Sequence, residues 1–309
     1  MHVFICLLLT IICTSCGNSP FLPFQGTAQK ISSSTDRAFS EYWYDGQAEI
    51  NIFEVRQARY ADIHPGKTVL IFVTEDFLID KQVKNEHYTG ERFTSILKTN
   101  SLRHFITGLY DYSIMTSVFT PVDRRQYPHS LKVTGSAQDW CGQSFSQMNL
   151  DQDQYRIRSY SYFEEKGDQE YLANTCLLED EILALIRIDP AKLPTGEIEV
   201  IPGMTISRLM NAKIQPFIAH ATLTDYDGND FPGNDLSSYL LKFQELNRSV
   251  EVVFTNEFPF EIIGWRDTYP TLSGEIMTST AVRTHKSKSK YWELHTLKDS
   301  SMRSRLGLQ

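Results

Sequence analysis

The sequence predicts a mainly β protein, either an antiparallel sandwich or a curved half-barrel, with few short helices. Two observations support this class. Turn-forming Gly, Pro and Asp-Gly positions recur about every 8 to 15 residues, and the segments between them are short and rich in β-branched and aromatic residues. Helical periodicity is scarce, so we expect a folded sheet to bury most of the apolar side chains.

The clearest strands come early in the chain. AEINIFEV (48–55) alternates and then changes phase at Phe53, which predicts a strand with a bulge. TVLIFVTEDF (68–77) is apolar on both phases, as expected of a strand that is covered on both faces. YRIRSYSYF (155–163) alternates apolar residues with arginines, which indicates a strand with one face in water.

Other segments extend the sheet, and two of them are ambiguous. DLSSYLLKFQELN (235–247) shows both a helical face and a strand alternation, and we favour a strand. NSLRHFITGLY (100–110) stays open between helix and strand. Further strands are expected at LKVTGSAQ (131–138), SFSQMNL (144–150), EILALIRI (181–188), GEIEVIP (196–202), FIAHATL (217–223) and VEVVF (250–254).

The first residues have the pattern of an export signal. MHVFICLLLTIICTSC (1–16) has no Asp, Glu, Lys or Arg, and its apolar core of about 11 residues suits a signal peptide but is too short to span a bilayer. Its end, CTSC, resembles the lipobox of bacterial lipoproteins. The resemblance implies cleavage before Cys16 and acylation of its thiol. An ordinary cleaved secretory signal is the alternative.

These features divide the chain into three parts. Residues 1–15 are expected to be the signal peptide, 16–34 the lipidated cysteine with a tether, and 35–309 a β-rich periplasmic region. This region forms one large domain or two β units that divide near 125–150. Several acyl chains on Cys16 would hold the protein in the bilayer. No acidic cluster follows Cys16, which favours an outer-membrane lipoprotein that faces the periplasm.

Composition limits the partners. The chain is 41% hydrophobic and 22% charged, as in ordinary globular proteins, and its net charge of −8 belongs entirely to the mature part. An acidic chain has no general attraction to polyanions, so we expect no nucleic-acid partner. No motif for a cofactor or a metal ion is present, and none is expected.

Removal of the leader leaves Cys16, Cys141 and Cys176. An oxidising envelope favours a Cys141–Cys176 disulfide, and two separate buried thiols are the alternative. The WCGQSF stretch around Cys141 suggests a redox site at first sight. A dithiol site needs a resolving cysteine three positions on, and that position holds Ser144.

Paired carboxylates occur in LEDE (178–181) and TED (74–76), and charged strand ends are their default interpretation. DYDGND (225–230) matches the first positions of a calcium loop but lacks the later Gly and Glu, so we expect a polar turn. Aromatic residues make up 12% of the chain. Sheet packing explains most of them, and a groove for a sugar, peptide or acyl chain is the sharper interpretation. The candidate binding residues are Tyr42, Trp43, Tyr44 and Trp265.

Several stretches together resemble a family of bacterial envelope lipoproteins of about 300 residues. They are YWYDGQAEI, RQARY, IFVTEDF, KQVK, DWCGQSF, SYSYFEE, LEDE, LPTGEIEVIP and NEFPFEIIGW. Members are often labelled septum formation inhibitor Maf, which implies a cytoplasmic nucleotide pyrophosphatase of α/β fold with a Ser-x-Ser-Pro-Arg-Arg loop. The nearest stretch here, VDRRQYP (122–128), lacks the serines and the proline of that loop. The resemblance brings no established activity.

The sequence therefore favours a membrane-anchored envelope lipoprotein with a non-enzymatic β domain. The domain would bind or scaffold an envelope protein, a glycan or an apolar ligand, and the lipid bilayer would hold Cys16. One alternative is a hydrolase or Maf-like nucleotide pyrophosphatase that uses carboxylates such as Glu75 and Asp76. The other alternative is a carrier of an apolar ligand.

Overall fold

The computed structural model describes residues 34–164 and 166–308. The expected signal peptide, Cys16 and the tether up to residue 33 lie outside the described residues. The described part forms one 16-stranded sheet. Its strands are β1 (Ala48–Arg59), β2 (Asp62–Leu78), β3 (Val83–Lys84), β4 (Phe93–Thr107), β5 (Tyr110–Pro121), β6 (Lys132–Asp139), β7 (Gly142–Asp151), β8 (Gln154–Ser161), β9 (Gln169–Asn174), β10 (Leu177–Leu178), β11 (Gly196–Ile201), β12 (Phe217–Asp225), β13 (Leu236–Phe243), β14 (Arg248–Thr255), β15 (Ile262–Pro270) and β16 (Ile276–Ser289).

The helices are short. They are α1 (Ser34–Trp43), α2 (Ile182–Ile188), α3 (Met204–Met210) and α4 (Ser301–Arg305), with 3-10 turns η1 (Glu179–Glu181), η2 (Pro190–Lys192), η3 (Tyr291–Glu293) and η4 (Leu297–Ser300). The predicted class, mainly β with few short helices, is confirmed. Within the described residues, no helix is long and apolar enough to cross a membrane.

The sheet consists of two antiparallel meanders that meet at β1. β1 pairs with β2 on one side and with β16 on the other, so the first and last strands lie in the middle of the sheet. One meander runs outward to β9, and the other runs outward to β11, where β10 adds a short parallel pair. Pairing continues through β5, β6 and β7, so the sheet shows no division near 125–150.

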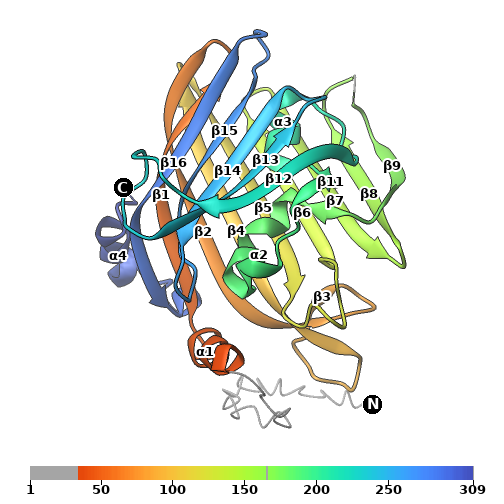
Figure 1. Ribbon diagram of the computed structural model, residues 1–309, viewed down its shortest axis with the longest axis vertical. Helices are drawn as coiled ribbons and strands as arrows, with labels where there is room; N and C mark the ends of the chain where they lie inside the picture. Colours follow the sequence, from red (N-terminus) through yellow and green to blue (C-terminus); the bar gives the residue numbers. More distant parts are fainter. Residues whose placement is uncertain (1–33, 165, 309) are drawn as a thin grey trace, which may run out of the picture.

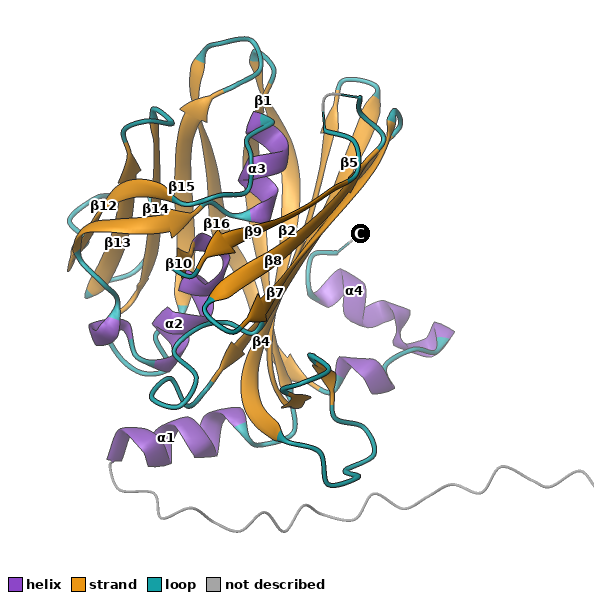
Figure 2. Ribbon diagram, turned by 90° about the vertical axis from the view of Figure 1, so that its right-hand side faces the viewer, coloured by secondary structure: helices purple, strands orange, loops and turns teal. Residues whose placement is uncertain are grey.

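The two ends of the sheet bend toward each other around α2 and α3 (Figure 2). The largest core cluster joins Phe53, Leu70 and Phe72 of one meander to Tyr239 and Leu241 of the other, with α2 between them. A second cluster packs β5 to β8 against α3. Helices α2 and α3 therefore fill the concave side of the sheet. The predicted curved half-barrel describes this architecture better than the predicted sandwich does.

Side chains also cover parts of the outer face. The segment after α4 places Leu306 and Leu308 against Ile50, Ile52 and Ile71 of β1 and β2. This cover explains why TVLIFVTEDF is apolar on both phases. Figure 1 shows α4 beside the outer surface of β1, and α1 at one end of the molecule.

The expected details are partly confirmed. The register of β1 against β16 shifts between Ile52 and Phe53, where the sequence predicts a bulge. The ambiguous segments 100–110 and 235–247 form parts of strands β4 and β13. The prediction of a strand over EILALIRI was wrong, because α2 occupies it. This segment lies inside the curved sheet with apolar neighbours on several sides, and periodicity does not separate a buried helix from a buried strand.

Candidate functional site

A cavity with about 820 Å³ of empty space, part of which is open solvent, lies on the concave side of the sheet. We call it the inner cavity. Strands β4 and β5 form one wall, and β13, β14 and β15 form the opposite wall. The η1–α2 segment and the start of α3 complete the lining. Sheet curvature thus brings together segments that are far apart in the sequence.

One wall of the inner cavity is polar. Thr99, Ser101 and Arg103 alternate along β4 and therefore point to the same face, where Thr116 of β5 lies opposite Ser101. The Thr99 hydroxyl is buried and has no hydrogen-bond partner. The Nε of Arg103 is also buried without a partner. The protein therefore leaves two buried hydrogen-bonding groups at this wall unused.

Arg103 is held from two sides. One guanidinium nitrogen donates to Gln57 Oε1 at 2.9 Å, and the guanidinium carbon lies 5.6 Å from the ring centroid of Trp265. Burial lowers the pKa of Arg103, although Tyr269 and Asp267 act in the opposite direction. Arg103 is half-buried, and no ion pair of the described residues includes it.

Two of the three LEDE carboxylates, Glu179 and Asp180, lie at this site. Both oxygens of Glu179 accept hydrogen bonds from Arg248, at 2.5 and 2.7 Å. Both oxygens of Asp267 accept from the same guanidinium, at 2.8 and 3.0 Å. Arg248 thus binds two carboxylates, and neither carboxylate accepts a hydrogen bond from Arg103, although both act on its charge through space.

Asp180 has a different environment. Its Oδ2 accepts the backbone N–H of Met204 at 2.8 Å, and a Cβ on Gly203 would lie 2.8 Å from its Oδ1. The glycine therefore allows this carboxylate to approach the start of α3. Burial raises the pKa of Asp180 to about 7, so the group changes charge near neutral pH.

The opposite wall of the inner cavity is mostly apolar. Leu241, Val250, Val252 and Trp265 line it, and Leu183 of α2 adds to it. A cavity with few convergent polar groups and an apolar remainder is typical of small-molecule sites. This geometry suits an amphipathic ligand with its polar end at β4.

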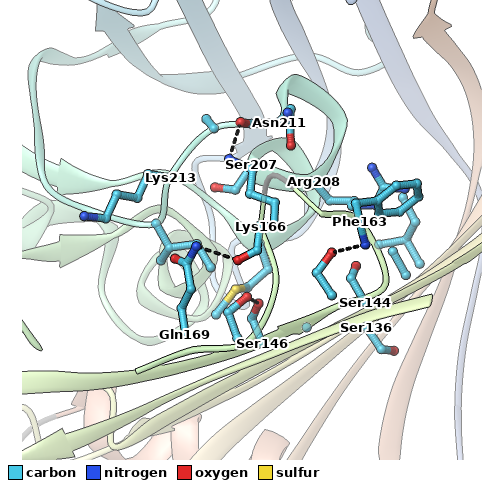
Figure 3. A pocket seen from close by; sticks show the side chains of 18 of the residues that line it. Ser136, Ser144, Ser146, Phe163, Lys166, Gln169, Ser207, Arg208, Asn211 and Lys213 are labelled. Carbon is cyan, nitrogen blue, oxygen red and sulfur yellow. Dashed lines mark hydrogen bonds between the residues drawn. The ribbon is translucent and has the colours of Figure 1, made fainter. Parts of the chain in front are cut away.

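A second pocket of about 750 Å³ lies on the other side of α3 (Figure 3). Its floor carries four serines in two cross-strand pairs, Ser144 with Ser161 and Ser146 with Ser159. Lys166 and Arg208 lie above this floor. Thr116 lines both pockets, and its hydroxyl lies 3.4 Å from that of Thr205 on α3.

The structure separates the four candidate aromatics. Trp265 lines the inner cavity, but Tyr42 and Trp43 pack at the end of the core. Trp43 is fully buried, and Tyr42 donates a hydrogen bond to Glu49. Tyr44 is 50% exposed, and its hydroxyl lies 2.9 Å from that of Ser95. Tyr42, Trp43 and Tyr44 thus form no groove with Trp265.

The expected hydrolytic carboxylates do not converge. Glu75 and Asp76 are consecutive residues of β2, so their side chains point to opposite faces of the sheet. Glu75 pairs with Lys98 at 3.5 Å, and Asp76 accepts a hydrogen bond from Tyr88 at 3.0 Å. Neither residue lines the inner cavity. The geometry does not support a hydrolase that uses this pair.

The expected disulfide is wrong for this structure. Cys141 is an exposed free thiol beside the start of β7, and Cys176 is a half-buried free thiol. Cys176 follows Asn174, which pairs with Gln154 near the far end of β7. The length of β7 separates the two thiols by roughly 30 Å, beyond the reach of a disulfide. The alternative of two buried thiols is also wrong for Cys141.

Sequence reasoning missed most of the site. It named LEDE and Trp265 but not Arg103, Arg248 or Asp267. One signal was available in TNSLRHF (99–105), where Thr99, Ser101 and Arg103 share a phase with buried Phe105 while Leu102 is exposed. Among the described residues, no group of three or more His, Cys, Asp or Glu side chains could hold a metal ion. No protein-family model, curated protein or solved structure matches the chain.

Proposed function

We propose that this chain is an envelope lipoprotein whose β domain binds a small amphipathic molecule in the inner cavity. One observation carries the proposal. Thr99 and Arg103 line a cavity whose opposite side is apolar, and each has one buried polar atom without a hydrogen-bond partner. An unsatisfied buried polar group costs about 1–3 kcal/mol, and a ligand that reached these atoms would recover this cost. The inner cavity could thus serve either of two functions expected from the sequence, a binding domain or a carrier of an apolar ligand.

The anchoring part of the proposal rests on the sequence of residues 1–16. An acylated Cys16 would tie the protein to the outer membrane, on its periplasmic side, through the tether. The described chain starts at α1, at one end of the molecule (Figure 1). A ligand taken up by the inner cavity would then be held close to the bilayer surface.

Extraction of the protein from its own cells tests the binding function. We expect the purified protein to release a small amphipathic molecule on denaturation, detected by mass spectrometry of the organic extract. Ser101→Trp fills the inner cavity and should abolish this molecule. The matched control is Leu102→Trp, because the neighbouring side chain is exposed on the other face of β4. Equal amounts of ligand in the two variants would contradict the proposal.

Cell fractionation tests the anchor. A Cys16→Ser variant with a cleavable signal should appear in the soluble periplasmic fraction, because it lacks the acyl chains that bind the bilayer. If this variant still fractionates with membranes, acylation of Cys16 is not the anchor.

A further inference from the structure

We propose that the ligand of the inner cavity carries a carboxylate that pairs with Arg103. This inference rests on the proposed function and names the chemical class of the ligand. It follows from the hydrogen bonds of the cavity wall, in which one guanidinium beside an apolar surface forms no ion pair among the described residues.

The two arginines at the cavity, Arg248 and Arg103, differ in how many of their donors are used. The four carboxylate oxygens of Glu179 and Asp267 all accept hydrogen bonds from Arg248. Arg103 donates only to the neutral amide of Gln57, and its buried Nε has no partner. Of the two guanidinium groups at the site, Arg103 therefore has the unused hydrogen-bond donors. A guanidinium recognises a carboxylate well, because its parallel N–H groups match the two oxygens.

Charge balance favours a single negative charge over two. With Asp180 protonated, the positive charges of Arg103 and Arg248 equal the negative charges of Glu179 and Asp267. A carboxylate leaves the site with one net negative charge, whereas a phosphate monoester brings up to two. A cationic head group would be repelled by Arg103, and the four carboxylate oxygens of Glu179 and Asp267 already accept hydrogen bonds from Arg248.

The cavity wall also indicates the nature of the rest of the ligand, beyond its carboxylate. Trp265 contacts the Arg103 guanidinium, and Leu241, Val250 and Val252 continue the apolar wall from there. A hydrocarbon chain that leaves the carboxylate would lie along this wall and bury apolar surface, which stabilises the complex by about 0.8 kcal/mol per methylene. The ligand class is therefore a medium-chain or longer carboxylic acid.

Asp180 makes the binding pH-dependent. The charged groups around it are Arg103 on β4, Glu179 on η1, Arg248 on β14 and Asp267 on β15. When Asp180 ionises, it repels the ligand carboxylate and partly neutralises Arg103. Both effects weaken binding, so the affinity should fall as the pH rises through neutrality.

Calorimetric titration with three head groups on one chain tests the inference. The protein is the mature chain with Cys16→Ser, which has no acyl chain of its own to enter the cavity. At pH 6 we expect octanoate to bind about tenfold more tightly than octan-1-ol, a difference of one charge-assisted contact, and octylamine to bind weakest. Octyl phosphate should bind more weakly than octanoate.

Two variants assign the preference to Arg103. Arg103→Gln should lose the tenfold preference of octanoate over octan-1-ol, whereas exposed Arg56→Gln should keep this preference. If Arg103→Gln does not fold, Arg103→Lys retains the charge and should still prefer octanoate over octan-1-ol. A preference that survives in a folded Arg103→Gln, or is lost in Arg103→Lys, would overturn the assignment.

The outcomes separate this inference from the proposed function. If octanoate and octan-1-ol bind equally, the carboxylate inference is wrong and amphiphile binding stands. If neither binds, the proposed function fails. The pH arm is independent of both: octanoate affinity should fall about three- to tenfold from pH 6 to pH 8, and Asp180→Asn should abolish this fall. A fall that persists in Asp180→Asn would overturn the role of Asp180.

Discussion

Glu49 and Arg187 form an ion pair in which neither side chain is exposed to solvent, with N–O distances of 2.5 and 2.7 Å. The guanidinium also lies 4.8 Å from the ring centroid of Trp43 and 4.9 Å from that of Phe72. The pair joins β1 to α2, and Tyr42 of α1 donates to the same carboxylate. It therefore fixes the helix that forms one side of the inner cavity.

Removal of one partner should be costly, because the other charge would remain buried. We expect Glu49→Gln to lower the free energy of unfolding by about 3–5 kcal/mol in chemical denaturation. Glu54→Gln, at an exposed position of the same strand, should change it by less than about 0.5 kcal/mol. Similar values for both variants would show that the buried pair adds nothing specific.

The Glu49–Arg187 pair should stabilise the protein less at low pH. Burial alone would raise the pKa of Glu49, but Arg187 and the hydrogen bonds from Tyr42 and Asn51 outweigh it and lower the pKa to about 2. A lowered pKa contributes stability that is complete above the ordinary value of 4.5 and is lost as the pH falls toward 2. The stability difference between wild type and Glu49→Gln should thus be constant above pH 5 and shrink below it. A difference that stays constant down to pH 2 would contradict this pKa.

The aromatic residues should divide by role. Trp265→Leu removes the ring that contacts Arg103 and lines the cavity, and we expect roughly tenfold weaker octanoate binding. Tyr44→Leu should leave the affinity unchanged, because this half-exposed ring lies outside the cavity. Calorimetry on folded variants measures both. Equal losses of octanoate affinity in the two variants would contradict a specific role of Trp265 in binding.

The two thiols should differ in reactivity. Cys141 is exposed and should react quickly with a maleimide at pH 8. Burial raises the pKa of the Cys176 thiol to about 12, so this half-buried cysteine should react slowly in the native protein and at once after denaturation. Mass spectrometry of labelled peptides measures both rates. A denatured, unreduced protein without free thiols would indicate a disulfide.

The sheet could be predicted from the sequence because alternation and turn residues are local signals. The bulge at Phe53 and the one-sided strand at Tyr155 and Ile157 are examples. Helix α2 could not be predicted, because its burial depends on a sheet that curves around it. The site was also hidden: Arg103, Asp180 and Trp265 come from distant segments, and only the curvature brings them together.

The most direct test of the inner cavity is a crystal structure of the mature Cys16→Ser chain with 8-bromooctanoate, read from the anomalous signal of bromine. We expect the carboxylate within about 3 Å of the Arg103 guanidinium and the bromine against the wall of Leu241 and Val252. Bromine in the serine-floored pocket beyond α3, or an unliganded Arg103 in a crystal that binds the compound elsewhere, would contradict the account.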